Sequence, residues 1–126
     1  AQLDAPTCAL SFPNSFARAR KNSIDLFAPA VLARVTGIRQ FENERSFCID
    51  FHNETSLLFK LHGSRGNILL LEGEKTTALF RNNLKADWAI SPATLHRPLA
   101  FTESDFHTNQ HQLRPWLFTF DRWIWR

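Results

Sequence analysis

The sequence lacks methionine and tyrosine altogether and has only two cysteines. Two cysteines are too few for a disulfide scaffold, and neither Cys8 nor Cys48 lies in a cluster with histidine at metal-binding spacing. We therefore expect free, mostly buried thiols in a reducing cytosol. Because the chain starts at Ala1 without an initiator methionine, we interpret it as a processed or excised piece of a longer protein.

Long apolar runs are also missing. No run approaches the ~20 residues that a membrane span needs, and no basic-then-apolar secretory segment opens the chain. The sequence therefore predicts a cytoplasmic protein without a membrane partner, although a leader could have been cut off.

The motifs of the common enzyme classes are absent as well. The chain has no Gly-x-Ser-x-Gly, no Walker loop and no dinucleotide-binding glycine pattern. His107 and His111 are four residues apart, but the residues between them are poor helix formers, and no Glu follows His107 as a zinc-protease helix requires. We predict that the protein is not an enzyme and has no metal site and no cofactor.

What the sequence contains is aromatic and apolar residues, with 12 Phe, 4 Trp and a hydrophobic content of 44%. A chain of 126 residues buries roughly two-thirds of its unfolded surface, which is enough for one core. The net charge of +3 weakly favours an anionic partner.

Four strands are predicted in the middle of the chain, at residues 45–51, 55–62, 68–72 and 75–81. In the first strand apolar and polar residues alternate with the period of a half-buried strand. The connections between the strands are two to five residues long, too short for a crossover helix, so the strands should form an antiparallel meander. The face expected to be buried contains Phe47, Ile49, Phe51, Leu57, Phe59 and Leu61.

The flanking segments give weaker signals. Residues 33–41 are expected to form a further strand with a bulge or bend at Gly37, and a helix is expected from Ser23, kinked or split by Pro29. We interpret residues 104–112 as loop or linker because they show no clear period.

The predicted division is one β domain at residues 1–90 and a linker with an aromatic helical segment at residues 91–126. The tryptophans at the end of that segment must pack on the sheet or on a partner, or belong to the first helix of a following domain.

A candidate site lies at the starts of two predicted strands. Glu44 and Arg45 lie at the start of one strand, and Arg65, Gly66 and Asn67 lie at the start of the strand two places along the meander, so both groups should lie at the same end of the sheet. Guanidinium groups with a neighbouring carboxylate and amide can bind phosphates and unpaired bases of RNA. The alternative is that Glu44 and Arg45 only pair with each other in a turn.

A second basic group, Arg18, Arg20 and Lys21, lies within four residues. It is either an anion-binding site or the solvated face of a helix, since charge runs are usually surface.

These residues resemble the N-terminal domain of the NFACT family, which includes the RqcH, NEMF and fibronectin-binding protein A groups. The resemblance spans roughly residues 10–87, with a weaker similarity at 118–125. Its best match is residues 58–70, which contain a strand, a loop with glycine and arginine, an Asn-Ile pair and a second, apolar strand. Further matching segments are 10–13, 16–22, 37–41 and 42–45. The resemblance implies an α+β fold, an antiparallel β-sandwich built around the meander with flanking helices, similar to the N-terminal domain of formamidopyrimidine-type DNA glycosylases.

The function that the resemblance implies is ribosome-associated quality control. Such a protein would bind tRNA and obstructed large ribosomal subunits, with no role on DNA. The family's Asp-Arg motif, linked to tail synthesis, falls on Glu44-Arg45, so the arginine matches and the acid is one methylene longer. The alternative function is an adhesin-type module that binds fibronectin.

Overall fold

The structure is a computed structural model of the chain, and it describes residues 14–15, 25–99 and 101–117. Its strands are β1 (Val35–Gln40), β2 (Ser46–Phe51), β3 (Thr55–Lys60), β4 (Asn67–Glu72) and β5 (Lys75–Leu79). Its short 3-10 helices are η1 (Ala28–Ala30), η2 (Gly63–Arg65), η3 (Lys85–Ala89) and η4 (Pro92–Thr94), and its α-helices are α1 (Glu103–Asn109) and α2 (Leu113–Trp116).

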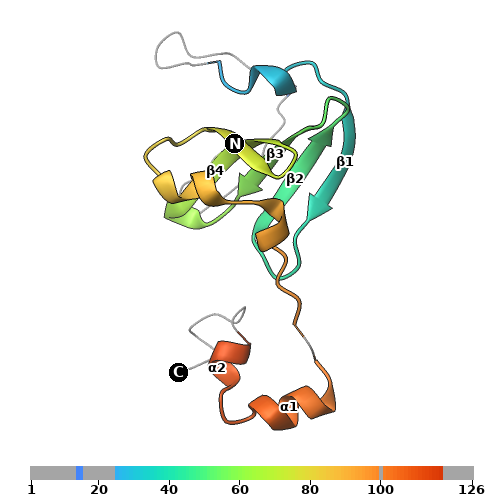
Figure 1. Cartoon of the computed structure of the whole chain (residues 1–126), viewed down its shortest axis with the longest axis vertical. Coiled ribbons are helices and arrows are strands. Elements are labelled where there is room, and N and C mark those ends of the chain that lie inside the picture. Colours follow the sequence, from blue (N-terminus) through green and yellow to red (C-terminus); the bar gives the residue numbers. More distant parts are fainter. Residues whose placement is uncertain (1–13, 16–24, 100, 118–126) are drawn as a thin grey trace.

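The five strands form one antiparallel sheet in the order β1-β2-β3-β4-β5 (Figure 1). The four strands predicted from alternation and short connections are present, and β1 is the further strand predicted before them. The register between β1 and β2 shifts between Val35 and Gly37, which confirms the bulge predicted at Gly37.

The predicted sandwich is not found in the described part of the chain, because the strands there belong to a single sheet. The helix predicted from Ser23 is represented there only by η1, which includes Pro29, and residues 16–24 lie outside the described residues. The observed architecture is therefore an antiparallel sheet with short helices, consistent with an α+β class.

The core lies on the face of the sheet opposite to the one predicted. Cys48, Leu58, Leu69 and Leu79 face one another in register across β2 to β5, and each is at most 2% exposed. The segment after β5 covers this face in Figure 1, and two of its partly buried residues pack against the core. These residues are Ile90 and Leu95.

The predicted face is less deeply buried. Phe59 is 7% exposed, whereas Phe47, Ile49 and Leu57 are half-buried. The reason is that β4 is apolar at successive positions and contributes to both faces, so alternation in β2 could not identify the more deeply buried one. Cys48 of β2 belongs to the core cluster on which Ile90 and Leu95 pack, and the ring of Phe47 lies on the other side of the sheet.

The buried thiol of Cys48 is free, as predicted for this cysteine, and Cys8 lies outside the described residues. Burial raises the pKa of Cys48 to about 11.

We expect Cys48 to be almost inert in the native protein. With a pKa of about 11, only about one thiol in a thousand is ionised at pH 8, and burial blocks access to it. In a Cys8→Ser variant, alkylation by iodoacetamide should be at least 100-fold slower under native conditions than in urea, which exposes the same thiol. Comparable native and unfolded rates would show that Cys48 is accessible.

The C-terminal described segment differs from the predicted loop. Residues 103–109 form helix α1, because the Thr102 side chain accepts the Asp105 backbone N–H and the Asp105 carboxylate accepts the Thr102 backbone N–H. The Thr102 hydroxyl and the Thr102 backbone N–H both donate to the Asp105 carboxylate, which lowers the pKa of Asp105. Helices α1 and α2 lie away from the sheet in Figure 1, and Trp116 contacts Phe106 with ring centroids 6.4 Å apart.

Within residues 25–99 and 101–117, no helix combines the length and the apolar character needed to cross a lipid bilayer.

Candidate functional site

The sheet register brings Arg45 and Arg65 to the same end of the sheet, as the meander predicted. Ser46 at the start of β2 pairs with Lys60 at the end of β3, and Lys60 pairs with Asn67 at the start of β4. Arg45 directly precedes β2, and Arg65 lies two residues before β4. Both side chains are exposed at this end.

The loop that presents Arg65 is a tight turn. Gly63 has a φ of +59°, a conformation that residues with a Cβ rarely adopt, and the N–H of Gly66 donates to the carbonyl of Gly63 at 2.8 Å. The N–H of Leu61 donates to the carbonyl of Arg45 at 2.8 Å, so this loop is attached to the backbone at the start of β2. The two arginines therefore project from connected backbone segments.

The carboxylate of Glu44 is used within the protein. Its Oε1 accepts the backbone N–H of Arg45 at 2.8 Å and lies 2.6 Å from Nε2 of His62. Glu44 thus bonds to the main chain of Arg45 and not to its guanidinium, so the simple turn ion pair considered as the alternative is not formed. Among the described residues, the guanidinium groups of Arg45 and Arg65 have no hydrogen-bond or ion-pair partner.

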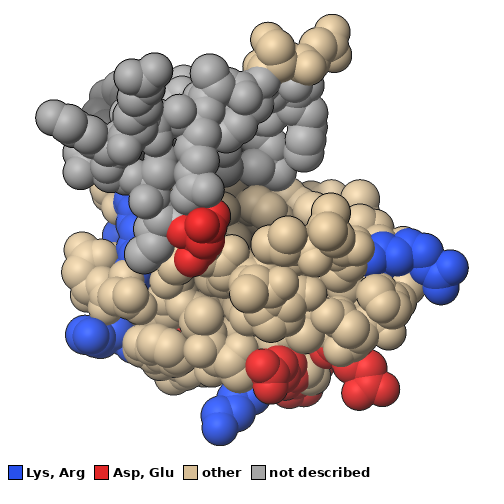
Figure 2. Space-filling view, turned by 90° about the horizontal axis from the view of Figure 1, so that it is seen from above, with Lys and Arg blue, Asp and Glu red and all other residues tan. Residues whose placement is uncertain are grey.

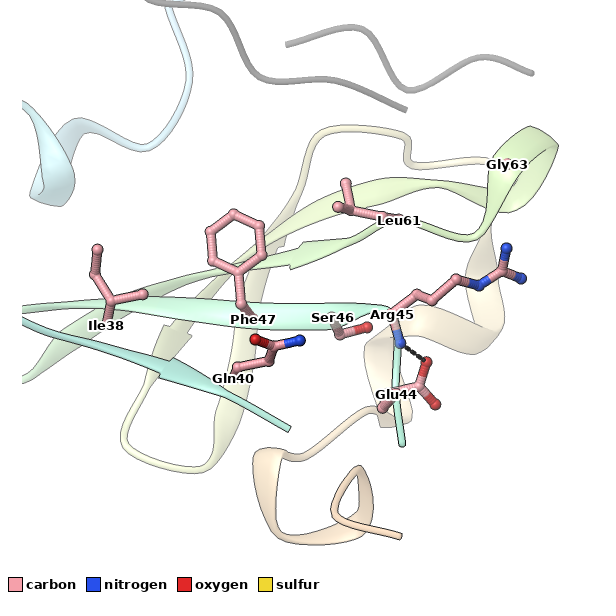
Figure 3. Close-up of a pocket in the computed structure, with 8 residues that line it drawn as sticks. All are labelled: Ile38, Gln40, Glu44, Arg45, Ser46, Phe47, Leu61 and Gly63. Carbon is pink, nitrogen blue, oxygen red and sulfur yellow. Dashed lines mark hydrogen bonds between the residues drawn. The ribbon is translucent and has the colours of Figure 1, made fainter. Parts of the chain in front are cut away.

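A cavity of about 510 Å³ lies beside Arg45 (Figure 3). It is lined by Ile38, Gln40, Glu44, Arg45, Ser46, Phe47, Leu61 and Gly63. Phe47 and Leu61 rise from the same side of the sheet, and the side chain of Arg45 extends toward the loop at Gly63. The cavity therefore has apolar walls and a charged rim.

One wall of the cavity is held in a fixed orientation. The ring of Phe47 stacks on the ring of Phe59 with centroids 4.9 Å apart and an interplanar angle of 5°. Since Phe59 is 7% exposed, it anchors Phe47 in the sheet.

Ser46 precedes Phe47 on β2, so its side chain lies on the opposite face of the sheet, where Ser46 pairs with the buried Lys60. Its Oγ is buried and has no hydrogen-bond partner within the described residues. Buried hydroxyls are normally satisfied, so this oxygen is an exception on the core face of the sheet.

Two predicted site residues are buried. Asn67 is 0% exposed, and its amide bonds to Asp87 and to the main chain of Arg81, so the predicted contact between Asn67 and a base edge is wrong. Gly66 is buried as well and only shapes the loop. The other predicted basic residues, Arg18, Arg20 and Lys21, lie outside the described residues.

The charges do not form one continuous basic patch on the face shown in Figure 2. Lys and Arg side chains are separated along its rim, with Asp and Glu side chains between them. The face in this view therefore offers separate cationic side chains and not one basic surface.

Sequence reasoning missed the apolar part of the site and His62. Ile38 comes from the edge strand β1 and is 69% exposed, and Leu61 follows the end of β3. One signal for His62 was its place directly before the Gly63 turn, which brings it to the same strand end as Glu44.

The described residues contain no group of three or more His, Cys, Asp or Glu side chains that could hold a metal ion. The pair His107 and His111 does not share a helix, because α1 ends at Asn109.

No protein-family model, curated protein or solved structure matches this chain.

Proposed function

We propose that the chain is an RNA-binding module of a ribosome-associated quality-control factor, which engages tRNA and obstructed large ribosomal subunits. The observation that carries the proposal is the pair of exposed guanidinium groups at one end of the sheet, Arg45 and Arg65, beside the cavity walled by Phe47. The resemblance of residues 10–87 to the NFACT N-terminal domain, with its glycosylase-like sandwich, supports the same assignment.

The chemistry of this end of the sheet suits an RNA loop. A guanidinium binds phosphate oxygens through two parallel hydrogen bonds, and an aromatic wall favours an unstacked base. Glu44, which stands where the family motif has Asp, is bonded to His62 and to the main chain of Arg45. In this proposal its role is to hold the backbone from which Arg45 projects.

Arg45→Ala should weaken tRNA binding without unfolding the protein, because Arg45 is exposed and lies outside the core. Loss of one phosphate contact should reduce the slope of log affinity against log salt by about 0.7 for single-stranded RNA. Arg45→Lys should restore the salt-dependent part of binding but not the two-bond geometry of the guanidinium. Salt titrations of tRNA binding by the whole protein would measure both effects.

Arg34→Ala is the matched control. Arg34 is exposed and directly precedes β1, which starts opposite Phe51 at the other end of the sheet, so its loss changes the net charge equally but at a distance from the site. Binding curves that coincide for wild type and the Arg45 variants, or that change equally in Arg34→Ala, would contradict the proposal.

A further inference from the structure

Three polar side chains are enclosed on the core face of the sheet. Lys60 is 5% exposed, Asn67 is 0% exposed and Asp87 is 3% exposed. Lys60 and Asn67 are directly opposed on β3 and β4, and Asp87 reaches them from η3. Lysine and aspartate are rarely buried to this extent, so this arrangement needs a specific reason.

The carboxylate of Asp87 joins the other two side chains. Its Oδ1 pairs with Nζ of Lys60, and its Oδ2 accepts Nδ2 of Asn67 at 2.8 Å. An amine and a carboxamide thus contact the two oxygens of one buried carboxylate. A group in this position can carry a proton from the amine to the amide nitrogen.

The amide of Asn67 is also polarised. Its Oδ1 accepts the backbone N–H of Arg81 at 2.8 Å and the backbone N–H of Ile68 at 3.0 Å. Two fixed N–H donors on a carbonyl oxygen stabilise the negative charge that develops when a nucleophile adds to the carbonyl carbon. The same donors hold the amide plane in place.

We propose that Lys60 and Asn67 form an intramolecular isopeptide bond, with Asp87 as the proton carrier. The inference rests on this buried cluster alone and is independent of the RNA-binding function. Transfer of a proton from Lys60 to the Asp87 carboxylate leaves a neutral amine, and a desolvated neutral lysine is a nucleophile.

The reaction is balanced without a further reagent. Nζ of Lys60 passes one proton to Asp87 and adds to Cγ of Asn67, and the resulting oxyanion is held by the N–H groups of Ile68 and Arg81. Asp87 then delivers its proton to Nδ2, and the Cγ–Nδ2 bond breaks to release ammonia. The second proton lost by Nζ is taken up by this ammonia, which leaves as ammonium. The product is a secondary amide between β3 and β4.

The bond would fix the loop that carries Arg65. Residues 61–66 connect Lys60 to Asn67, so the cross-link closes this connection into a covalent ring at the end of the sheet that carries the candidate site.

The test is the intact mass of the denatured, purified chain. We expect the mass of the wild type to be lower than the sequence mass by one ammonia molecule, with a cross-linked peptide containing Lys60 and Asn67 after digestion. Lys60→Arg and Asp87→Asn should each have the full sequence mass, and Asn67→Asp should lose water in place of ammonia. Asn83→Ala, a change at an exposed asparagine, should retain the ammonia deficit.

A wild-type mass equal to the sequence mass would overturn the proposal and leave the cluster as a buried ion pair. A deficit of one water molecule would also overturn it, because that loss places the bond between Lys60 and Asp87. Because mass is measured on denatured protein, these results do not depend on the stability of a variant.

Discussion

Asp87→Asn is expected to lower the free energy of unfolding by about 3–5 kcal/mol, because it leaves a buried lysine without its counter-charge. The substitution preserves the shape of the side chain and an oxygen that can accept from Asn67. The loss of stability therefore measures the contribution of the negative charge that faces Lys60, whose side chain is 6% exposed. The variant also lacks the proton carrier of the proposed cross-link, which acts in the same direction.

Urea unfolding of wild type and variant measures this loss, and Asp50→Asn is the control. Asp50 forms a two-bond pair with Arg39, at 2.7 and 2.9 Å, which lowers the pKa of its carboxyl group. The Arg39 side chain is 49% exposed and the Asp50 side chain 22% exposed, so removal of this charge should cost at most about 1 kcal/mol. Equal losses of unfolding free energy in the two variants would show that burial does not make the Lys60–Asp87 pair contribute more to stability than the exposed pair.

The strands were predictable because their signals are local. Two-residue alternation, short connections and a glycine within β1 together predict the antiparallel sheet and the bulge at Gly37. The same logic predicted that Arg45 and Arg65 share one end of the sheet, since that follows from the number of turns between them and needs no side-chain detail.

The missed features depend on contacts between distant segments. Nothing local in the sequence distinguishes Lys60 from an exposed strand lysine, because its burial arises from Asp87 in the segment that folds back over the sheet. The cavity likewise combines Ile38, Phe47 and Leu61 from three parts of the chain. The capping pair Thr102 and Asp105, by contrast, is a local signal for α1 that does not depend on an apolar period.

The two faces of the sheet can be distinguished by neighbouring residues on β3. Leu57 and Leu58 are consecutive, so their side chains point to opposite faces, with Leu57 paired to Ile49 and Leu58 paired to Cys48. Leu58 is 0% exposed, whereas Leu57 is half-buried. The same truncation at these two positions therefore compares the observed core with the face that alternation in β2 had favoured.

Leu58→Ala should cost about 2–5 kcal/mol of stability, because it removes a fully enclosed side chain and leaves a cavity among Cys48, Leu69 and the covering segment. Leu57→Ala should cost about 1–2 kcal/mol, since part of that side chain already contacts solvent and the neighbouring residues can relax. Chemical unfolding with a common m-value would rank the two variants. A larger loss for Leu57→Ala would place the main core on the face of Phe47 and Phe59, where the stacked rings lie.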